Sequence, residues 1–310
     1  MTSLNVISPG IVSLLVDGGR IGMQDQGFSG SGPLDPVSFR FAQWLCGNAI
    51  DTAAIEIVGN AAFRFNMAAT IALCGPDVHL TIDGGEFPTW QTVTVKPGQT
   101  IQISAEQIGQ RYYLAVSADW QVPTVAGSAC TVMREKLGGL KGDGSPLKAG
   151  DDLSMKARAV APTRKIPYSL RPDFSLTTPV DIIPGYQHLA FDTVTQATFY
   201  SSAYTVTPQS DRMGMRLSGA AVPSSLTAMR SEGINFGSVQ VPSDGQPIIM
   251  LADRQTLGGY PKIGVVASYD IPRLAQAVAG SELAFTPVDA NNARSTWLLK
   301  ETKIKRFFQE

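Results

Sequence analysis

Hydrophobic and polar residues alternate along much of the first half of the chain. In the clearest case Val78, Leu80 and Ile82 are separated by polar residues, and the glycine-containing turn 83–85 follows them. A period of two that ends in a glycine turn predicts half-buried strands of an antiparallel sheet. The same pattern predicts strands around residues 11–16, 63–65, 93–95, 101–103 and 112–117. Short strands with evenly spaced turns are typical of a β-barrel or a β-sandwich.

Three segments have the signals of short helices. Asp35 precedes a proline and then a helical stripe of apolar residues, so it is expected to cap a helix that ends at Gly47. A second helix is expected around residues 192–200. Asp270 is expected to cap a third helix, with a proline in its first turn and Gly280 at its end. The predicted fold class is therefore mainly β with a few short helices.

The stretch 238–276 contains the most informative pattern. Three apolar runs, 238–241, 247–252 and 262–268, predict strands. Between the second and third runs, residues 255–262 read Gln-Thr-Leu-Gly-Gly-Tyr-Pro-Lys. Two adjacent glycines allow a ligand or another chain to approach the backbone, and amides and hydroxyls surround them. This loop is therefore either a structural turn or a binding site.

Length and composition predict two globular domains. The chain has 310 residues, of which 44% are hydrophobic and 16% are charged, so it can bury a large core. The basic, proline-containing segment 156–168 has a weak pattern and is expected to hold the domain boundary. We therefore expect an N-terminal β-rich domain at residues 1–160 and a C-terminal β domain at residues 161–310.

Charge and residue usage argue against several classes of function. The 25 basic and 26 acidic residues give a net charge of −1, so no basic excess points to a nucleic acid or an anionic membrane. No signal peptide and no transmembrane helix is expected, which predicts a cytoplasmic protein. His79 is expected to be a solvated side chain, and His188 is expected to be a solvated loop residue, with a functional role as the alternative. Cys46, Cys74 and Cys130 are scattered and are expected to be reduced core thiols, so no metal site is expected.

The remaining candidates are loops rich in polar groups and poor in titratable ones. They span residues 27–35, 211–214 and 255–262. Such loops suit the binding of a neutral, hydrogen-bonding ring or the stabilisation of an oxyanion. Arg212 can equally form a structural ion pair, whereas for Asp35 the role of a helix cap is favoured over a role in the site. No Walker loop is present, so ATP binding is not expected of this chain.

At these loops the sequence resembles the biotin-dependent carboxyltransferase proteins called the allophanate hydrolase subunit 2 family. This family includes the C subunit of bacterial 5-oxoprolinase, the carboxyltransferase part of urea carboxylase (urea amidolyase) and an antagonist of a sporulation-kinase inhibitor. The most specific matches are Asp-Arg-Met-Gly at 211–214, Val-Gln-Val-Pro at 239–242 and Gln-Thr-x-Gly-Gly-Tyr-Pro-Lys at 255–262. Further matches, such as Asp-Gly-Gly-Arg at 17–20 and Leu-Gly-Gly at 137–139, extend the resemblance over nearly the whole chain.

The resemblance implies a fold, a set of partners and a cofactor. At least one domain, here 161–310, should be a cyclophilin-like β-barrel. A protein similar to allophanate hydrolase subunit 1 should share the active site. A biotin carboxylase, or the A subunit of 5-oxoprolinase, is the further partner of the larger complexes. The cofactor should be carboxybiotin carried on a partner, and ATP should be used by a partner protein. The reaction implied is carboxyl transfer to an amide or urea-like nitrogen.

On this resemblance we assign the site residues as a hypothesis. The residues expected to bind the cofactor lie on the glycine loop and on the preceding strand: Gln240, Thr256, Gly258, Gly259 and Tyr260. The residues expected to act in catalysis carry a cation or an amide: Arg212, Lys262 and Gln255. The cations would hold a carboxyl group, and backbone N–H groups would stabilise a ureido oxyanion. No metal is expected.

The sequence departs from the family pattern in its first half and leaves the function class open. The departures are at Val16, 117–119, 129–131 and Asp143, whereas the C-terminal motifs are intact. We therefore expect an altered substrate side, with 5-oxoproline, urea, or another amide or amidine as the acceptor. The alternative is a non-catalytic regulatory protein that sequesters a subunit-1-like kinase inhibitor, in which the site motifs should tolerate mutation. A solitary amidohydrolase is less favoured, because no metal site or nucleophile–base pair is visible.

Overall fold

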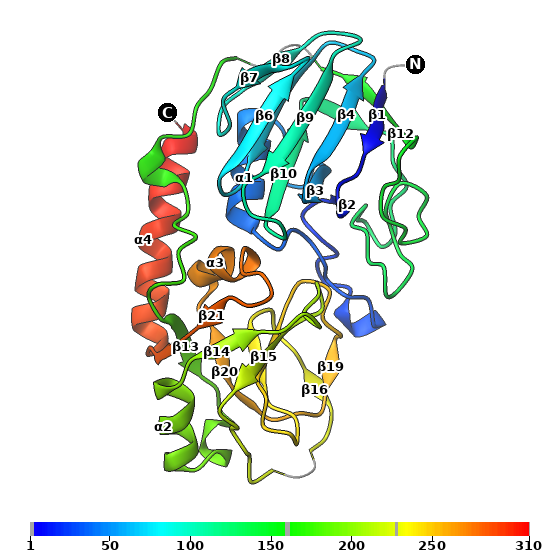
Figure 1. Cartoon of the computed structure of the whole chain (residues 1–310). Helices are drawn as coiled ribbons and strands as arrows, with labels where there is room; N and C mark the ends of the chain where they lie inside the picture. The colour runs from blue at the N-terminus through cyan, green and yellow to red at the C-terminus, as the bar shows by residue number, and fades with distance from the viewer. Residues whose placement is uncertain (1–2, 159–161, 227–228, 310) are drawn as a thin grey trace. The chain divides into compact units, whose positions relative to one another are not determined.

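The computed structural model describes residues 3–158, 162–226 and 229–309, and its Cα positions form two compact units (Figure 1). Unit 1 comprises Met1–Met23 and Ser31–Pro172, and unit 2 comprises Gln24–Gly30 and Asp173–Glu310. The boundary expected between residues 160 and 161 lies outside the described residues. Residues 164–166 belong to unit 1 because Thr92 N donates to Arg164 O at 2.9 Å and Ile166 N donates to Trp90 O at 2.9 Å.

Unit 1 contains two antiparallel sheets. The first has seven strands in the order β11 (Ala118–Trp120), β12 (Asp152–Ala157), β1 (Ser3–Ser8), β4 (Ala61–Phe65), β9 (Thr100–Ala105), β6 (Val78–Ile82) and β7 (Gly85–Phe87). The second has five strands in the order β2 (Val12–Val16), β3 (Ala54–Val58), β10 (Arg111–Val116), β5 (Ala69–Cys74) and β8 (Val93–Val95). The strands expected from the alternating pattern are confirmed, with ends that shift by a residue or two.

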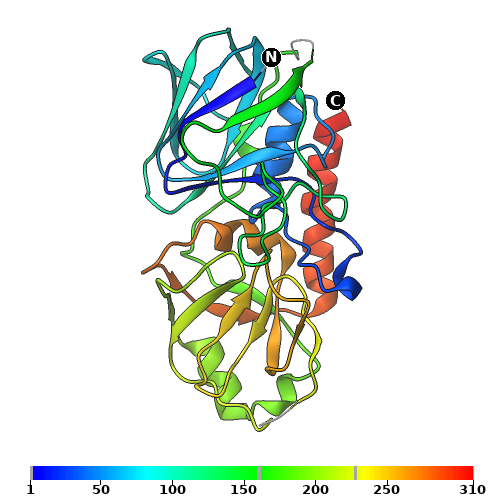
Figure 2. The same cartoon turned by 90° about the vertical axis from the view of Figure 1, so that its right-hand side faces the viewer.

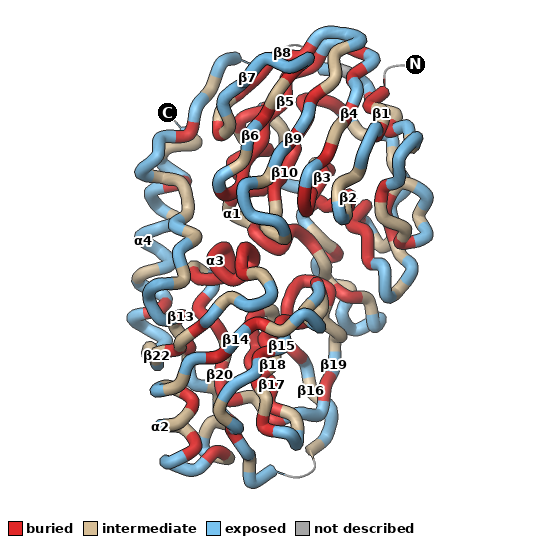
Figure 3. The backbone as a smooth tube through the Cα atoms, in the orientation of Figure 1, coloured by how far each residue is buried: buried red, intermediate tan, exposed pale blue. Residues whose placement is uncertain are grey.

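The alternating pattern buries one face of each sheet in a common core. Phe63, Leu80 and Ile103 of the first sheet and Ile57 and Leu114 of the second belong to one cluster of buried side chains. Because successive side chains of a strand point to opposite faces, a period of two puts every second residue into this core. Figure 2 shows the strands from a second side, and Figure 3 shows that buried residues gather on them.

Helix α1 (Pro36–Leu45) begins and ends where the sequence predicts. The Asp35 carboxylate accepts hydrogen bonds from Val37 N at 3.1 Å and Ser38 N at 3.0 Å. Gly47, with a φ of 65°, follows the last residues of the helix in the left-handed region. Asp35 and Gly47 therefore fix the two ends of the helix that lies against β5 and β10.

We expect Asp35→Ala to lower the free energy of unfolding by about 1–2 kcal/mol, the usual loss for an N-cap. Asp35→Asn keeps an oxygen that can accept from the same backbone N–H groups, so most of the stability should return. Urea unfolding followed by circular dichroism measures both variants. Equal stability of Asp35→Ala and the wild type would contradict the capping role.

Unit 2 is built on an eight-stranded sheet that nearly closes into a barrel. Its strands follow the order β21 (Glu282–Leu283), β14 (Tyr204–Val206), β15 (Gly214–Gly219), β18 (Ile248–Met250), β17 (Ser238–Gln240), β20 (Lys262–Val266), β13 (Val180–Pro184) and β22 (Phe285–Pro287). Only residue 284 separates the two edge strands in the chain, which brings the edges together. A separate two-stranded sheet pairs β16 (Glu232–Gly233) with β19 (Leu257–Gly258). The prediction of a mainly β fold with a barrel is confirmed.

The helices of unit 2 match the sequence less well. Helix α2 (Thr193–Ser201) lies where a helix was expected, and the structure shows that Asp192 caps it. The prediction for Asp270 is wrong: its carboxylate accepts from Asp181 N at 2.8 Å and pairs with Arg273, so it makes no cap hydrogen bond. The 3₁₀ helix η4 (Ser268–Asp270) leads into α3 (Ile271–Ala275), which ends well before Gly280.

Helix α4 (Ala290–Gln309) was not predicted. Three short 3₁₀ helices, η1 (Gln24–Gln26), η2 (Tyr168–Leu170) and η3 (His188–Ala190), complete the regular structure. Among the described residues, no helix combines the length and the apolar character needed to cross a lipid bilayer.

Candidate functional site

Gln240 and Lys262 lie directly opposite each other in the barrel sheet of unit 2. Strand β17 pairs antiparallel with β20, and the register joins Gln240 to Lys262 just after an irregularity at Val239. Directly opposed residues of neighbouring strands point to the same face of a sheet. The sequence-predicted amide and cation therefore share one face of the barrel.

The backbone of Gly258 lies against two side-chain amides. A Cβ atom built on Gly258 would lie 2.8 Å from Gln240 Nε2 and 3.2 Å from Gln255 Nε2. It would also lie 2.5 Å from Ile234 Cδ1. These distances are shorter than ordinary carbon contacts, so a side chain at this position would displace the neighbouring side chains. The structure thus brings together three of the residues selected from the sequence: Gln240, Gln255 and Gly258.

The Gln240 amide is buried with an unused donor. Its side chain is 2% exposed, and Nε2 has no hydrogen-bond partner among the described residues. Leaving a buried donor unsatisfied typically costs about 1–3 kcal/mol. Most buried polar atoms in native proteins are paired, and an exception calls for an explanation such as a ligand. Nε2 of Gln240 is therefore a donor available to a bound group beside Gly258.

Lys262 is held by a carboxylate that the sequence did not single out. Its Nζ pairs with Glu232, which lies on β16 directly opposite Gly258 on β19. Tyr186 OH also donates to Glu232, and Gln187 Nε2 donates to Glu232 Oε1 at 2.7 Å. The hydrogen bonds from Lys262 and then Tyr186 lower the pKa of Glu232, whereas the hydrogen bond to Glu232 raises the pKa of Tyr186. An ion pair with two further hydrogen bonds thus borders the glycine loop.

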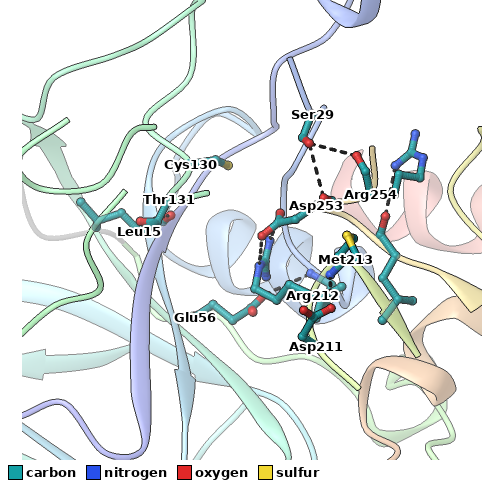
Figure 4. Close-up of polar contacts among 12 residues, drawn as sticks. Leu15, Ser29, Glu56, Cys130, Thr131, Asp211, Arg212, Met213, Asp253 and Arg254 are labelled. Carbon is teal, nitrogen blue, oxygen red and sulfur yellow. Dashed lines mark hydrogen bonds and ion pairs between the residues drawn. The ribbon is translucent and has the colours of Figure 1, made fainter. Parts of the chain in front are cut away.

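Arg212 forms a bidentate ion pair at the start of the glycine loop. Its Nε and Nη2 lie 2.9 Å and 3.0 Å from the two carboxylate oxygens of Asp253, as Figure 4 shows. Both side chains are buried, and Asp253 N donates to Arg212 O at 2.9 Å. Of the two roles that the sequence left open for Arg212, the structure forms the ion pair. This pair fixes the chain two residues before Gln255.

The remaining selected residues lie on the same loop. Thr256 O accepts a hydrogen bond from Ile234 N at 3.1 Å, which joins the loop to the segment after β16. A Cβ atom on Gly259 would lie 3.5 Å from Met229 O, an ordinary contact. Tyr260 is exposed. These three residues therefore lie on the glycine loop, directly after Gln255.

A family model supplies the comparison that identifies this architecture. The model described as carboxyltransferase domain, subdomain A and B, matches residues 26–287. The chain belongs to the carboxyltransferase domain family. It is 33% identical to the 5-oxoprolinase C subunit of Escherichia coli (strain K12), over 99% of this chain and 97% of that protein.

Solved structures agree with this carboxyltransferase domain over almost its full length. The structure of TTHA0988 gives a TM-score of 0.83 at 33% identity and covers 92% of this chain and 55% of that one. The structure of the K. lactis urea amidolyase gives a TM-score of 0.89 at 26% identity and covers 98% of this chain and 20% of that one. The chain therefore spans about half the length of the first protein and a fifth of the second.

The two histidines of the carboxyltransferase domain make local contacts, and its three cysteines are buried. His79 is exposed beside Glu106, as expected, and His188 Nδ1 lies 2.9 Å from Gly185 O in its own turn. Cys46, Cys74 and Cys130 are buried and unpaired, as expected for core thiols. No three His, Cys, Asp or Glu side chains in the described part of the chain are grouped so that they could hold a metal ion.

One departure from the family pattern surrounds Asp17 in unit 1. The Asp17 carboxylate accepts from Ser128 Oγ and Ala129 N, both at 2.6 Å, and lies 3.1 Å from Cys130 Sγ. Burial raises the pKa of the Cys130 thiol to about 12, so it is not a nucleophile at neutral pH. Thr131 N donates to Leu15 O at 2.9 Å. The departure at 129–131 is therefore part of a buried structural network.

Proposed function

We propose that this chain is the carboxyltransferase component of a 5-oxoprolinase-type or urea carboxylase-type complex and acts on an amide or urea-like nitrogen. The resemblance to the 5-oxoprolinase C subunit over nearly the full length of both chains supports this assignment. The K. lactis urea amidolyase contains a corresponding part within a much longer chain. We therefore assign the other activities to partner chains: a subunit-1-like protein, and a biotin carboxylase or the 5-oxoprolinase A subunit.

The proposal is carried by the unused donor of Gln240 beside Gly258. Carboxybiotin, held on a partner, supplies the activated carboxyl group when it is bound. Its neutral ring needs hydrogen-bond donors without a full charge, and the Gln240 amide is such a donor. Gln255 Nε2 lies near the same glycine, 3.2 Å from a Cβ atom built there. Gly258, Gly259, Thr256 and Tyr260 complete the loop that we propose as the ring-binding surface.

We assign the carboxyl group to Lys262. An ammonium has three N–H donors, and Glu232 is its one side-chain acceptor among the described residues. Lys262 therefore keeps donors for a carboxylate on the face that it shares with Gln240. Arg212 is occupied by Asp253, so we propose that it acts through the position of the loop instead of touching the substrate. ATP would be used by a partner protein, and the acceptor stays open between 5-oxoproline, urea and related amides.

Gln240→Leu separates binding from stability. The substitution removes a buried donor that has no partner, so we expect the free energy of unfolding to stay equal or to rise. Carboxyl transfer should fall about tenfold, since one uncharged hydrogen bond contributes about 1.4 kcal/mol. The assay uses the complex purified with its partners and measures ATP hydrolysis that depends on 5-oxoproline or urea. Urea unfolding of the same preparation gives the stability.

Gln43→Leu is the matched control, because Gln43 is a buried glutamine with satisfied hydrogen bonds. Its Oε1 accepts from Asn48 Nδ2 at 2.7 Å, and its Nε2 donates to Thr52 O. This variant should lose about 1–3 kcal/mol of stability. Unchanged transfer by Gln240→Leu would contradict the proposed site. The regulatory class would be favoured by two results together. The wild-type complex would transfer no carboxyl group, and every site variant would bind the subunit-1-like partner normally.

A further inference from the structure

The carboxylate of Glu232 accepts hydrogen bonds from three side chains, which come from two separate segments of unit 2. Lys262 Nζ comes from β20, whereas Tyr186 OH and Gln187 Nε2 come from the turn after β13. The Glu232 side chain is 32% exposed and the Lys262 side chain is 11% exposed, so the carboxylate lies nearer to solvent than the ammonium. Glu232 also pairs with Gly258 across the two-stranded sheet. The carboxylate thus borders both the cation and the glycine loop.

Gln187 closes a ring of hydrogen bonds around Lys262. Its Oε1 accepts from the backbone N of Lys262 at 2.8 Å, and its Nε2 donates to Glu232 Oε1 at 2.7 Å. The same Glu232 oxygen accepts from Lys262 Nζ. The ring therefore connects the ammonium of Lys262 to its own backbone through two other side chains. A lysine side chain is otherwise among the most flexible, and fixing it requires compensating contacts of this kind.

Tyr186 supports the ring from the solvent side. Its hydroxyl accepts from Gln187 Nε2 at 3.0 Å and donates to Glu232, and its ring centroid lies 5.9 Å from Lys262 Nζ. Tyr186 is 74% exposed, so most of its surface is not needed for the core. Tyr186 contacts both members of the ion pair while it remains exposed, so its side chain contributes little to the packing of the core.

We propose that Glu232 is a positioning residue that, together with Gln187 and Tyr186, holds the Lys262 ammonium in place for the carboxyl group. This inference rests on the proposed function, because it deepens the role given there to Lys262. The sequence motifs contain Lys262 but none of the three residues that hold it. Glu232 acts through Lys262 and does not itself touch the carboxyl group.

The carboxylate of Glu232 allows a direct test that needs no activity. Glu232 faces Lys262 on β20, Tyr186 and Gln187 after β13, and the backbone of Gly258 on β19. Because the pKa of Glu232 is lowered, the ring is intact above the ordinary pKa of a glutamate and is lost as the pH falls through the lowered value. Carboxyl-carbon NMR of the full chain, labelled at glutamate, measures this titration, and a Glu232→Gln sample assigns the signal.

We expect the Glu232 signal to titrate below the ordinary glutamate range in the wild type and to move upward in Lys262→Met and Tyr186→Phe. The shift should be larger in Lys262→Met, because the hydrogen bond from Lys262 is the largest cause of the lowered pKa. An ordinary glutamate titration in the wild type would show that the ring does not form in solution. That result would overturn this inference and leave the proposed function untouched.

A double-mutant cycle then separates positioning from a merely structural contact. Glu232→Gln should lower kcat about tenfold in the wild-type complex and should have no further effect on kcat in a Lys262→Met background. Equal effects in both backgrounds would mean that Glu232 does not act through Lys262 and would overturn the inference. If Lys262→Met leaves transfer unchanged, the role of Lys262 in the proposed function fails, whereas the NMR titration still reports whether the ring exists.

Discussion

Gly258→Val is expected to lose carboxyl transfer by about a hundredfold or more while the barrel of unit 2 remains folded. A Cβ atom at this position would lie 2.5 Å from Ile234 Cδ1, 2.8 Å from Gln240 Nε2 and 3.2 Å from Gln255 Nε2. All three atoms are at the ends of side chains, which can move aside without unfolding the strands. Because this movement displaces two proposed donors at once, the loss should match or exceed the ~10²–10³ typical of one preorganised donor.

Gly233→Val provides the matched control for Gly258→Val. Gly233 lies in the partner strand of the same two-stranded sheet, opposite Leu257, and no atom lies within 4 Å of a Cβ built there. Valine is also favoured in strands, so neither stability nor transfer should fall. The measurement is acceptor-dependent ATP hydrolysis by the complex, with circular dichroism as the check on folding. Wild-type transfer by Gly258→Val would remove the glycine loop from the site.

The sequence predicted most strands because their burial follows a simple period. Leu80 and Ile82 are buried and His79 is exposed, as the alternation in β6 requires. Helix α4 lacks such a signal, since its buried residues within the described chain are Ala293 and Ile304 while Leu298 and Leu299 are exposed. A stripe of two buried residues in a 20-residue helix is too weak to be read from the sequence.

The helix expected from Asp270 shows how a tertiary contact overrides a local signal. An aspartate before a proline resembles an N-cap in both Asp35 and Asp270. The Asp35 carboxylate accepts from Val37 N and Ser38 N of its own helix, whereas the Asp270 carboxylate accepts from Asp181 N and Arg273 Nη1. The sequence contains no information on these partners, which lie on β13 and in α3. The same local pattern therefore gives two different structures.

The sequence indicates those residues of the candidate site that lie close together along the chain. It does not indicate those that strand pairing brings to the site from distant segments. Gln240, Gly258 and Lys262 lie within a short stretch whose motifs and glycines single it out. Glu232 and Tyr186 come from segments separated by more than forty residues, and only the pairing of β13 with β20 and of β16 with β19 brings them together. A single sequence does not specify such pairings.

Asp253→Ala is expected to destabilise unit 2 by about 3–5 kcal/mol, the usual effect of removing one partner of a buried ion pair. Arg212 is 7% exposed, and without Asp253 its charge would lose a bidentate carboxylate in a buried environment. Since Asp253 lies two residues before Gln255, the glycine loop should also lose its fixed start, and transfer should fall with stability. Urea unfolding measures the first effect, and hydrogen exchange of peptides that contain residues 253–262 measures the second.

The double variant Arg212→Met, Asp253→Leu shows whether the destabilisation by Asp253→Ala comes from the unpaired charge of Arg212 or from the lost contact between the two side chains. Replacing both members of a buried pair by apolar residues is often close to neutral, so the double variant should be more stable than Asp253→Ala. It would still lack the two parallel hydrogen bonds that join positions 212 and 253 in the wild type, so hydrogen exchange in the loop should stay faster than in the wild type. If the double variant has normal stability and a rapidly exchanging loop, the role of Arg212 is to order the glycine loop through its ion pair. Normal exchange in the loop would contradict that role, because it would show that the loop is ordered without the ion pair.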